Sequence, residues 1–185
     1  MSGKSTDQKS THRAIASLYR RPGFLIRRAH QIAVSIFLEE AAELGITTTQ
    51  YGALVVLSAA ENIDQIGLAK LVGIDRSTAA LVVSKLEAAG LLVRENDPND
   101  RRRSVLALTA DGRQMLERLA KPAERAQERA LSAFSKQEAK HFLELLGQFV
   151  DTFNEETRAP IVTLASNAPE EARPAPRRRR AGGGR

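Results

Sequence analysis

The fold is decided by residues 64–111, which read DQIGLAKLVGIDRSTAALVVSKLEAAGLLVRENDPNDRRRSVLALTAD. Two short amphipathic runs in this stretch are separated by the four residues Val72–Asp75. Gly73 falls where a tight turn between helices requires a positive φ. Asp75 is a good N-cap, because its carboxylate can accept an unpaired backbone N–H. We therefore predict helices over residues 65–71 and 76–89, with Gly90 ending the second helix.

The second helix has two distinct sides. Apolar residues recur at helical spacing and predict a buried stripe: Ala79, Val82, Val83 and Leu86. The remaining residues fall largely off that stripe: Arg76, Ser77, Thr78, Ala80, Leu81, Ser84 and Lys85. This second set predicts an exposed face.

A basic hairpin is predicted to follow this helix. Leu91–Val93 reads as a strand, Asp97–Asp100 is dense in turn-forming residues, and Ser104–Thr109 returns as a second strand. Three arginines, Arg101, Arg102 and Arg103, sit at or just past the tip. Helix, turn, helix and a two-stranded wing outline a winged helix-turn-helix, whose second helix fits the DNA major groove. An arginine on a narrow hairpin can enter the minor groove, where negative potential is concentrated.

Three segments resemble the signature of the MarR family of transcription regulators in identity, spacing and order. They are LEAAGLLVR at Leu86–Arg94, DPNDRR at Asp97–Arg102 and LTADG at Leu108–Gly112. With the flanking helices, the resemblance extends over roughly residues 24–157. It implies a mainly α fold with a small β-wing, in which a winged helix-turn-helix is combined with N- and C-terminal dimerisation helices.

The resemblance also implies roles for individual residues. Ser77, Thr78, Ser84 and Lys85 form the expected major-groove face, flanked by Arg76, and the alternative for this face is a solvated helix surface. The family often has threonine and arginine where this chain has Ala80 and Leu81. This difference removes hydrogen-bonding groups from the helix, and apolar contact with thymine methyl groups is the alternative way for these two residues to meet the bases. In the wing, Asp100 would orient the hairpin and Arg102 would enter the minor groove. Arg101 and Arg103 could contact phosphates, and the alternative for all three arginines is a solvated loop.

Further helices are predicted on both sides of this unit. We expect one over residues 22–44, ended by Gly45, and another over residues 50–60. After the wing, Thr109 can cap a helix to about Phe134, bent by Pro122. Ser135 and Glu138 form a capping box for a last helix, whose apolar stripe comprises Phe142, Leu145, Leu146, Phe149, Val150 and Phe153. Terminal helices with apolar stripes and little core of their own indicate a two-fold homodimer, which would bind an inverted-repeat operator.

The positive charge of the chain lies at its C-terminal end. The formal net charge of the 185 residues is +6, but six arginines follow residue 172 and no acidic residue follows Glu171. Residues 1–172 therefore have 22 basic and 22 acidic residues. Whole-chain charge is thus no evidence that the folded domain binds DNA. We expect three parts: a flexible segment at 1–21, the dimer domain at 22–159 with its DNA-binding part at about 47–109, and a disordered Arg-rich tail at 160–185.

Composition narrows the remaining function classes. The chain contains no cysteine, which excludes disulfides, cysteine-based zinc sites and thiol switches. The N-terminal residues lack the apolar core of a secretory signal and no apolar run approaches a membrane span, so we expect a cytoplasmic protein. The three histidines lie in separate predicted elements, and no phosphate-binding glycine loop occurs. We expect no enzyme activity, metal or cofactor.

The resemblance also implies an effector site between the dimerisation helices and the winged domain. Many effectors of the family are aromatic carboxylates or related phenolic compounds. Candidate polar groups are Arg28, His30 and Tyr51, with Phe24 as an apolar wall. His30 lies on an apolar seam, where a core or interface role is the alternative. Arg28 could pair with an anionic effector, such as an aromatic acid or acyl-CoA thioester, or with Glu40 or Glu43.

The leading prediction is a ligand-responsive, dimeric transcription repressor, with activation as an open alternative. An architectural protein that binds DNA nonspecifically through its arginine tail is a second interpretation. A winged helix that is catalytic, or that is used only for protein contacts, is a third.

Overall fold

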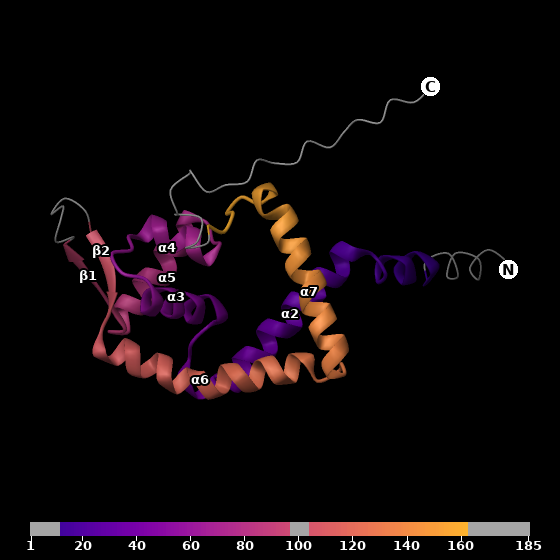
Figure 1. Cartoon of the computed structure of the whole chain (residues 1–185), viewed down its shortest axis with the longest axis horizontal. Helices are drawn as coiled ribbons and strands as arrows, with labels where there is room; N and C mark the ends of the chain where they lie inside the picture. Colours follow the sequence, from indigo (N-terminus) through magenta and orange to yellow (C-terminus); the bar gives the residue numbers. More distant parts are fainter. Residues whose placement is uncertain (1–11, 97–103, 163–185) are drawn as a thin grey trace, which may run out of the picture.

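The computed structural model describes residues 12–96 and 104–162, and these form a mainly helical chain with a two-stranded wing (Figure 1). Residues 12–18 are helical. The named elements follow in the order α2 (Pro22–Glu40), η1 (Ala42–Leu44), α3 (Thr48–Ala59), α4 (Gln65–Val72), α5 (Arg76–Ala88), β1 (Leu92–Asn96), β2 (Ser104–Leu108), α6 (Ala110–Leu131), α7 (Lys136–Phe153) and η2 (Asn154–Glu156). The predicted fold class is confirmed.

Local chemistry explains where these helices begin and end. Thr47 and Gln50 form a reciprocal capping box at the start of α3, and Ser135 and Glu138 form the predicted one at α7. Gly45, Gly73 and Gly90 have φ values of 63°, 72° and 72°, as the sequence predicted for three helix ends. The first predicted helix closes with a short 3₁₀ turn, and α6 ends at Leu131, three residues earlier than predicted.

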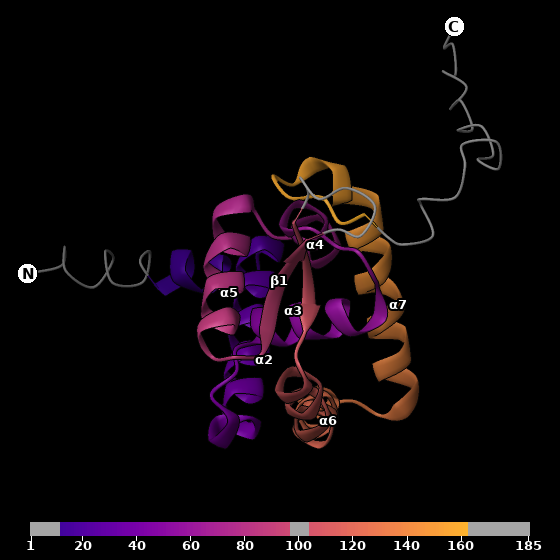
Figure 2. The same cartoon turned by 90° about the vertical axis from the view of Figure 1, so that its left-hand side faces the viewer.

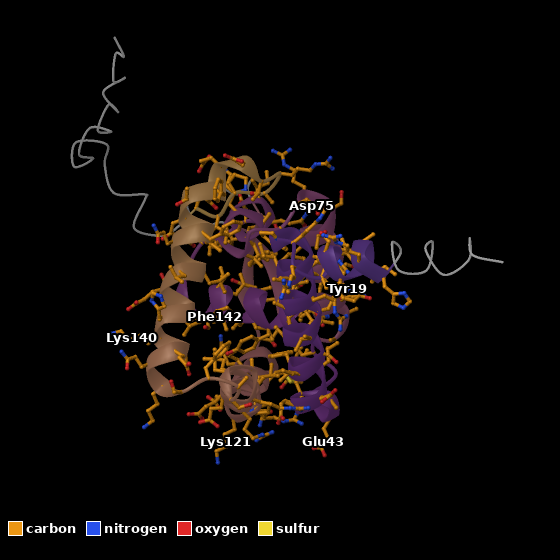
Figure 3. All side chains as sticks on the ribbon, turned by 90° about the vertical axis from the view of Figure 1, so that its right-hand side faces the viewer. Tyr19, Glu43, Asp75, Lys121, Lys140 and Phe142 are labelled. Atoms are coloured by element: carbon orange, nitrogen blue, oxygen red, sulfur yellow. The ribbon has the colours of Figure 1, made fainter. Side chains whose placement is uncertain are left out.

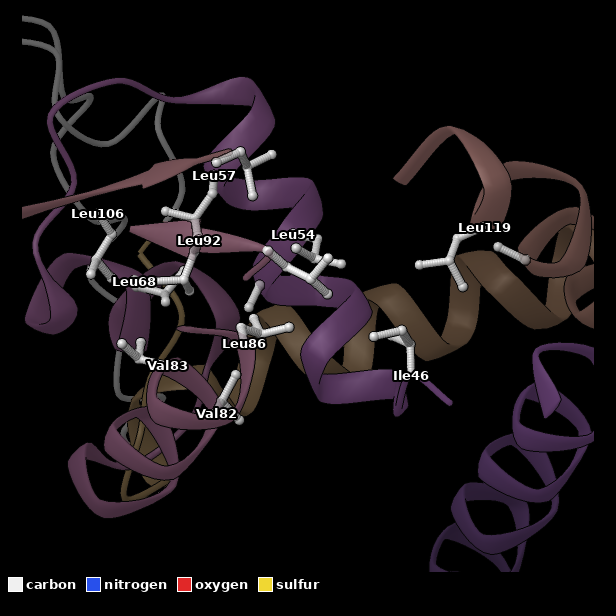
Figure 4. Packing of buried hydrophobic residues seen from close by; sticks show 14 of the residues in the cluster. Ile46, Leu54, Leu57, Leu68, Val82, Val83, Leu86, Leu92, Leu106 and Leu119 are labelled. Carbon is white, nitrogen blue, oxygen red and sulfur yellow. The ribbon is translucent and has the colours of Figure 1, made fainter. Parts of the chain in front are cut away.

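The core gathers around α3. Leu54 of α3, Leu68 of α4 and Leu86 of α5 are fully buried, and Leu119 of α6 is fully buried too. Figure 4 shows these side chains converging on α3 together with Leu92 of the wing. The predicted stripe of α5 is confirmed, because its buried residues are Ala79, Val82, Val83 and Leu86.

The wing is an antiparallel ladder that runs from the pair Leu92–Leu108 to the pair Asn96–Ser104. A bridge that the sequence did not predict joins it to the α3–α4 connection, where the Leu106 N–H donates to the Ile63 carbonyl at 2.7 Å. The wing is therefore attached along one edge to the helical core.

Helix α7 and most of α2 lie outside this core. Every residue on the apolar stripe of α7 is between 38 and 52% exposed, and Phe37 is the buried residue of α2. Figure 3 shows Lys140 on the outer side of α7 and Phe142 on the side that faces α2. The exposed stripe leaves a large apolar surface without a partner in the described part of one chain.

Helix α2 packs against α6, and an ion cluster lies where they meet. Arg125 Nε is 2.9 Å from Glu40 Oε2, and Arg129 reaches both Glu39 (2.7 Å) and Glu40 (3.3 Å). The hydrogen bond from Arg125 lowers the pKa of Glu40 most, with a further contribution from Arg129. The alternative pairing of Arg28 with Glu40 is not observed, because Arg28 donates to Gln31 at 2.9 Å.

Residues 154–162 form what we call the C-terminal strap. It leaves the end of α7 and returns to α4, where the Val162 N–H donates to the Lys70 carbonyl at 3.1 Å. The described contacts thus continue three residues past the predicted boundary at residue 159. Residues 163–185, the rest of the predicted tail, lie outside the described residues, as do most of the predicted N-terminal segment and the wing tip.

The junction between the wing and α6 requires a residue without a side chain. The Thr109 hydroxyl accepts from the Gly112 N–H at 3.0 Å and donates to the Gly90 carbonyl at 2.7 Å. Gly112 is buried, and a Cβ there would overlap the backbone carbonyl of Leu91. This close approach gives a physical reason for the glycine in the LTADG segment.

Gly112→Ala is therefore expected to lower the free energy of unfolding by about 1–3 kcal/mol, because rigid backbone must move to admit the methyl group. Chemical denaturation measures the change. Gly23→Ala is the matched control, since a Cβ at Gly23 meets nothing within 4 Å. Equal stability of the two variants would contradict the proposed close approach.

Candidate nucleic-acid interface

The turn between α4 and α5 fixes the angle at which α5 leaves the core. Asp64 caps α4 by accepting from the Gly67 N–H at 2.7 Å. At the C-terminal end of α4, the N–H groups of Gly73 and Ile74 both donate to the Ala69 carbonyl. Asp75 then caps α5, with 2.9 Å between its Oδ1 and the Thr78 nitrogen. Each end of the turn is thus fixed by hydrogen bonds.

Helix α5 presents an open face opposite its buried stripe. Figure 2 shows α5 at the surface beside the wing strands. Six of the predicted major-groove residues are exposed on it: Arg76, Ser77, Ala80, Leu81, Ser84 and Lys85. Leu81 is 57% exposed, so its apolar side chain is available for contact on this face. Thr78 differs from the others, because it is half-buried and its hydroxyl donates to Asp75 at 2.7 Å.

Both acidic residues at the ends of α5 are engaged within the chain. The backbone N–H of Thr78 and then its hydroxyl lower the pKa of Asp75, whose carboxylate is turned toward the helix end. Glu87 pairs with Arg94 at 3.4 Å. Arg76 and Lys85 remain as exposed cations, so the open face favours a polyanion although the folded domain has no excess positive charge.

Arg94 links the wing to α5. Its guanidinium contacts Glu87 of α5 and donates to Gln65 of α4 at 3.0 Å. The sequence presented Arg94 only as part of a family signature, since its partners are 7 and 29 residues away. The four candidate residues of the wing tip, Asp100, Arg101, Arg102 and Arg103, lie outside the described residues.

The candidate effector residues lie on two helices. Phe24 is half-buried, 5.1 Å from Tyr19 between ring centroids, while Arg28 and His30 are exposed on α2. Tyr51 of α3 is half-buried against Phe37, with 5.4 Å between ring centroids. His30 is therefore not part of the core of one chain.

Three cavities on the described surface stand out, and none of these three is lined by Phe24, Arg28, His30 or Tyr51. The first, about 570 Å³, lies between the α4–α5 turn, the end of α7 and the C-terminal strap. The second, about 560 Å³, follows the ion cluster of α2 and α6, and the third, about 320 Å³, lies between α3 and the wing. The four candidate effector residues therefore lie outside these three cavities.

Residues 12–96 and 104–162 contain neither a metal-binding cluster nor a membrane-spanning helix. No group of three or more acidic or histidine side chains there could bind a metal ion. No helix in these ranges combines the length and apolarity needed to cross a membrane.

The known proteins that this chain resembles in sequence are described as transcription regulators. A sequence model of the MarR family matches residues 46–104. A putative transcriptional regulatory protein for the hcr operon of Thauera aromatica is 34% identical over 118 residues, covering 63% of this chain and 71% of that protein.

Solved structures show the same similarity. BpsR of Bordetella bronchiseptica, whose DNA binding is regulated by 6-hydroxynicotinic acid, matches with a TM-score of 0.68 and 29% identity over 72% of this chain and 95% of its own. The repressor CouR bound to a 23-mer DNA duplex matches with a TM-score of 0.67 and 30% identity over 72% of this chain and 94% of its own. CouR from Rhodococcus jostii RHA1 bound to p-coumaroyl-CoA matches with a TM-score of 0.62 and 26% identity over 79% of this chain and 98% of its own.

The cap of α5 gives a pH-dependent prediction. The pKa of Asp75 is lowered on folding, so its stabilisation is complete above the ordinary aspartate pKa of 3.8 and is lost as the pH falls through the lower folded value. Asp75→Ala should lower the melting temperature at pH 7, and its difference from the natural chain should shrink below about pH 4.

Asp75→Ser is the matched variant, because serine can cap the helix but does not titrate. Its difference from Asp75→Ala should persist in acid. Thermal unfolding from pH 3 to 7 measures all three proteins. A constant difference between the natural chain and Asp75→Ala across this range would contradict the role of the charged carboxylate.

Proposed function

This chain belongs to the MarR family of transcription regulators, and we propose that it is a dimeric repressor that leaves an inverted-repeat operator when an aromatic acid or aromatic acyl-CoA binds. The open face of α5 carries the proposal. It is polar and cationic, lies beside the wing, and is fixed by a capped turn at its N-terminus. These features suit a helix whose N-terminal residues contact base edges and phosphates.

The proposed DNA contacts follow from this arrangement. Ser77 and Ser84 offer hydrogen bonds, Arg76 and Lys85 offer phosphate contacts, and Leu81 with Ala80 would meet thymine methyl groups. Thr78 would act mainly through the cap of α5. We assign Arg102 to the minor groove and Asp100 to orienting the wing, and Arg101 and Arg103 to adjacent phosphates. The DNA-binding part is then residues 47–109 within a domain at 22–159.

The dimer is proposed from the apolar surface that one chain leaves exposed. The stripe of α7 carries Phe142, Phe149 and Phe153, and α2 exposes Leu25 and Ile32 at 53 and 50%. Burying such a surface against a second copy removes it from water and creates a two-fold axis. Two copies of α5 would then meet successive major grooves about one helical turn apart.

The effector is proposed by analogy with the relatives. The DNA binding of BpsR is regulated by 6-hydroxynicotinic acid and CouR binds p-coumaroyl-CoA, and both of these molecules are anions that contain an aromatic ring. In this chain Tyr51 and Phe24 would contact the ring, and Arg28 would pair with the carboxylate or a CoA phosphate. His30 would be a further polar contact. None of these residues lines the three cavities described above, and we propose that a second copy completes the pocket.

The dimer can be tested on α7. Phe149→Asp with Phe153→Asp would place two carboxylates in the apolar interface, which is strongly unfavourable without partners. Sedimentation should show a monomer, or circular dichroism should show loss of structure. Gln137→Asp with Gln148→Asp adds the same charge on the polar side of α7 and should leave the dimer intact. A folded dimer of the phenylalanine variant would show that the stripe faces elsewhere.

Operator binding and release can be tested on DNA upstream of the chain's own gene. We expect a short palindromic footprint and a shifted band that disappears on adding 6-hydroxynicotinate, other aromatic acids or p-coumaroyl-CoA. Lys85→Ala should weaken binding. It should also make the fall of log binding constant with log salt concentration shallower by about 1 per half-site, as removal of one phosphate-binding cation does. Lys140→Ala, on the outer side of α7, should change neither.

Release should also depend on Arg28. Arg28→Ala should keep DNA affinity but need much more effector for release, whereas Arg28→Lys should retain part of the response. Equal binding of promoter and random DNA would argue for the architectural alternative. An unchanged response of Arg28→Ala would remove Arg28 from the proposed pocket.

A further inference from the structure

The C-terminal strap is a closed loop that Asn154 holds to the end of α7. The Asn154 side chain brackets Ile161, since its Nδ2 donates to the Ile161 carbonyl at 3.0 Å and its Oδ1 accepts from the Ile161 N–H at 2.8 Å. The Asn154 carbonyl also accepts from the N–H and the hydroxyl of Thr157, at 3.3 and 3.0 Å. One asparagine at the end of α7 therefore fixes where the strap turns back.

The far end of the strap rests on the helix-turn-helix, and Figure 1 shows this segment running from the end of α7 to α4. Ile161 packs on Gly73 in the turn between α4 and α5, where a Cβ would come within 2.5 Å of Ile161 Cγ1. The Val162 N–H donates to the Lys70 carbonyl of α4 at 3.1 Å. The missing side chain of Gly73, whose φ is 72°, thus serves both the turn and the strap.

Within one chain, the strap spans a gap between α7 and the helix-turn-helix. The cavity of about 570 Å³ lies in this gap, lined by Phe149 and Phe153 of α7, by Ile74 of the turn and by the strap. No residue of α7 is buried in one chain. The chain also enters α7 from α6, at the opposite end of α7 (Figure 1). The strap is therefore the connection of α7 that lies nearer to α5.

The length of α7 makes this second connection important. Its 18 residues span roughly 27 Å. If α7 were attached only at α6, a rotation of about 10° at that end would move the other end by about 5 Å. This displacement exceeds the rise of one base pair, which is roughly 3.4 Å. Fixing both ends of α7 therefore matters for a dimer whose two recognition helices must match two half-sites.

We propose that the C-terminal strap is a positioning element, which fixes the distance between the two copies of α5 and so selects operators with one spacing of half-sites. The inference rests on the proposed function, since it takes α7 as a dimer helix and α5 as the helix that enters the major groove. Asn154 and Ile161 act through the turn at Gly73 and touch no DNA in this role. An undocked strap leaves each copy of α5 intact but lets the two copies reach half-sites over a wider range of spacings.

The test compares five full-length proteins. Besides the natural chain, they are Asn154→Ala, which removes the bracket, Ile161→Ala, which removes the contact with Gly73, and the conservative variant Ile161→Val. Gln148→Ala is the matched control, because it removes an exposed amide side chain from the polar side of α7. Ile161 is 41% exposed, so its replacement should leave the fold and the dimer intact.

Two of the measurements need no DNA. Hydrogen exchange reports strap docking through the amides of Ile161 and Val162, which should be protected in the natural chain, Ile161→Val and Gln148→Ala and exchange faster in Asn154→Ala and Ile161→Ala. Because the chain contains no cysteine, Ser84→Cys on the exposed face of α5 can carry one spin label in each copy. The distribution of distances between the two labels should be narrow with the strap docked and broader with it released.

Binding is then measured on the footprinted operator, on versions with the half-sites moved one or two base pairs closer or farther apart, and on random DNA of equal length. The natural chain should prefer one spacing. Asn154→Ala and Ile161→Ala should lose roughly 2- to 30-fold in affinity for that spacing, the range for residues that couple two sites. Their affinity for random DNA should stay natural, so their profile across spacings should be flatter.

A natural spacing profile, or a natural distance distribution, in variants with fast strap exchange would overturn the proposal. Unprotected strap amides in the natural chain, or an equal loss of affinity for every duplex, would overturn it as well. Failure of the proposed repressor function looks different, since the natural chain would then bind the promoter no better than random DNA. The distance distribution between the labels still decides the inference in that case.

Discussion

The position of the DNA-facing surface depends on the burial of one side of α5. Val83 and Leu86 are fully buried with Leu54 of α3 and Leu68 of α4. Burial of each such side chain stabilises the fold by roughly 1.5–3 kcal/mol, and interiors are packed too closely for the helix to rotate freely about its axis. Because the stripe cannot turn, Leu81 and Lys85 must face solvent. The direction in which the helix presents its polar residues is therefore a consequence of core packing, and the caps only fix where the helix begins.

Local rules account for the parts of this fold that the sequence predicted. The cap of α5, the capping box of α7 and the glycine at each helix end involve partners three to five residues apart, so residue type and spacing suffice. The contacts that the sequence did not predict join distant residues. Glu40 meets Arg125 across 85 positions, and Arg94 meets Gln65 across 29. Many polar side chains could have paired with either arginine, and only the packing of α2 on α6 or of the wing on α4 selects one.

The candidate site divides in the same way. The open face of α5 was predictable because it is the complement of a buried stripe on the same helix. The sequence itself placed the wing arginines at a hairpin tip, but their separate roles came only from the family pattern, and they lie outside the described residues. The effector residues illustrate a different limit. Arg28 and His30 are exposed on α2, most of which lies outside the core of one chain, whereas Tyr51 of α3 packs against Phe37. In the proposed dimer the surroundings of Arg28 and His30 would depend on the second copy. The spacing of residues in a single sequence carries little information about a pocket that two chains would complete, as proposed here.

The links between the dimer helices and the winged unit constrain how a repressor of the proposed kind can release DNA. An effector shifts an equilibrium only by its differential affinity for two arrangements. Here the arrangements must differ in the distance between two copies of α5, and α7 is connected to α5 both through α6 and through the C-terminal strap. The ion cluster of Glu40 with Arg125 and Arg129 additionally fixes α2 on α6. A ligand bound at the proposed site near α2 and Tyr51 would act on helices that are joined by packing to the rest of the domain, so we expect a small displacement there to reach α5.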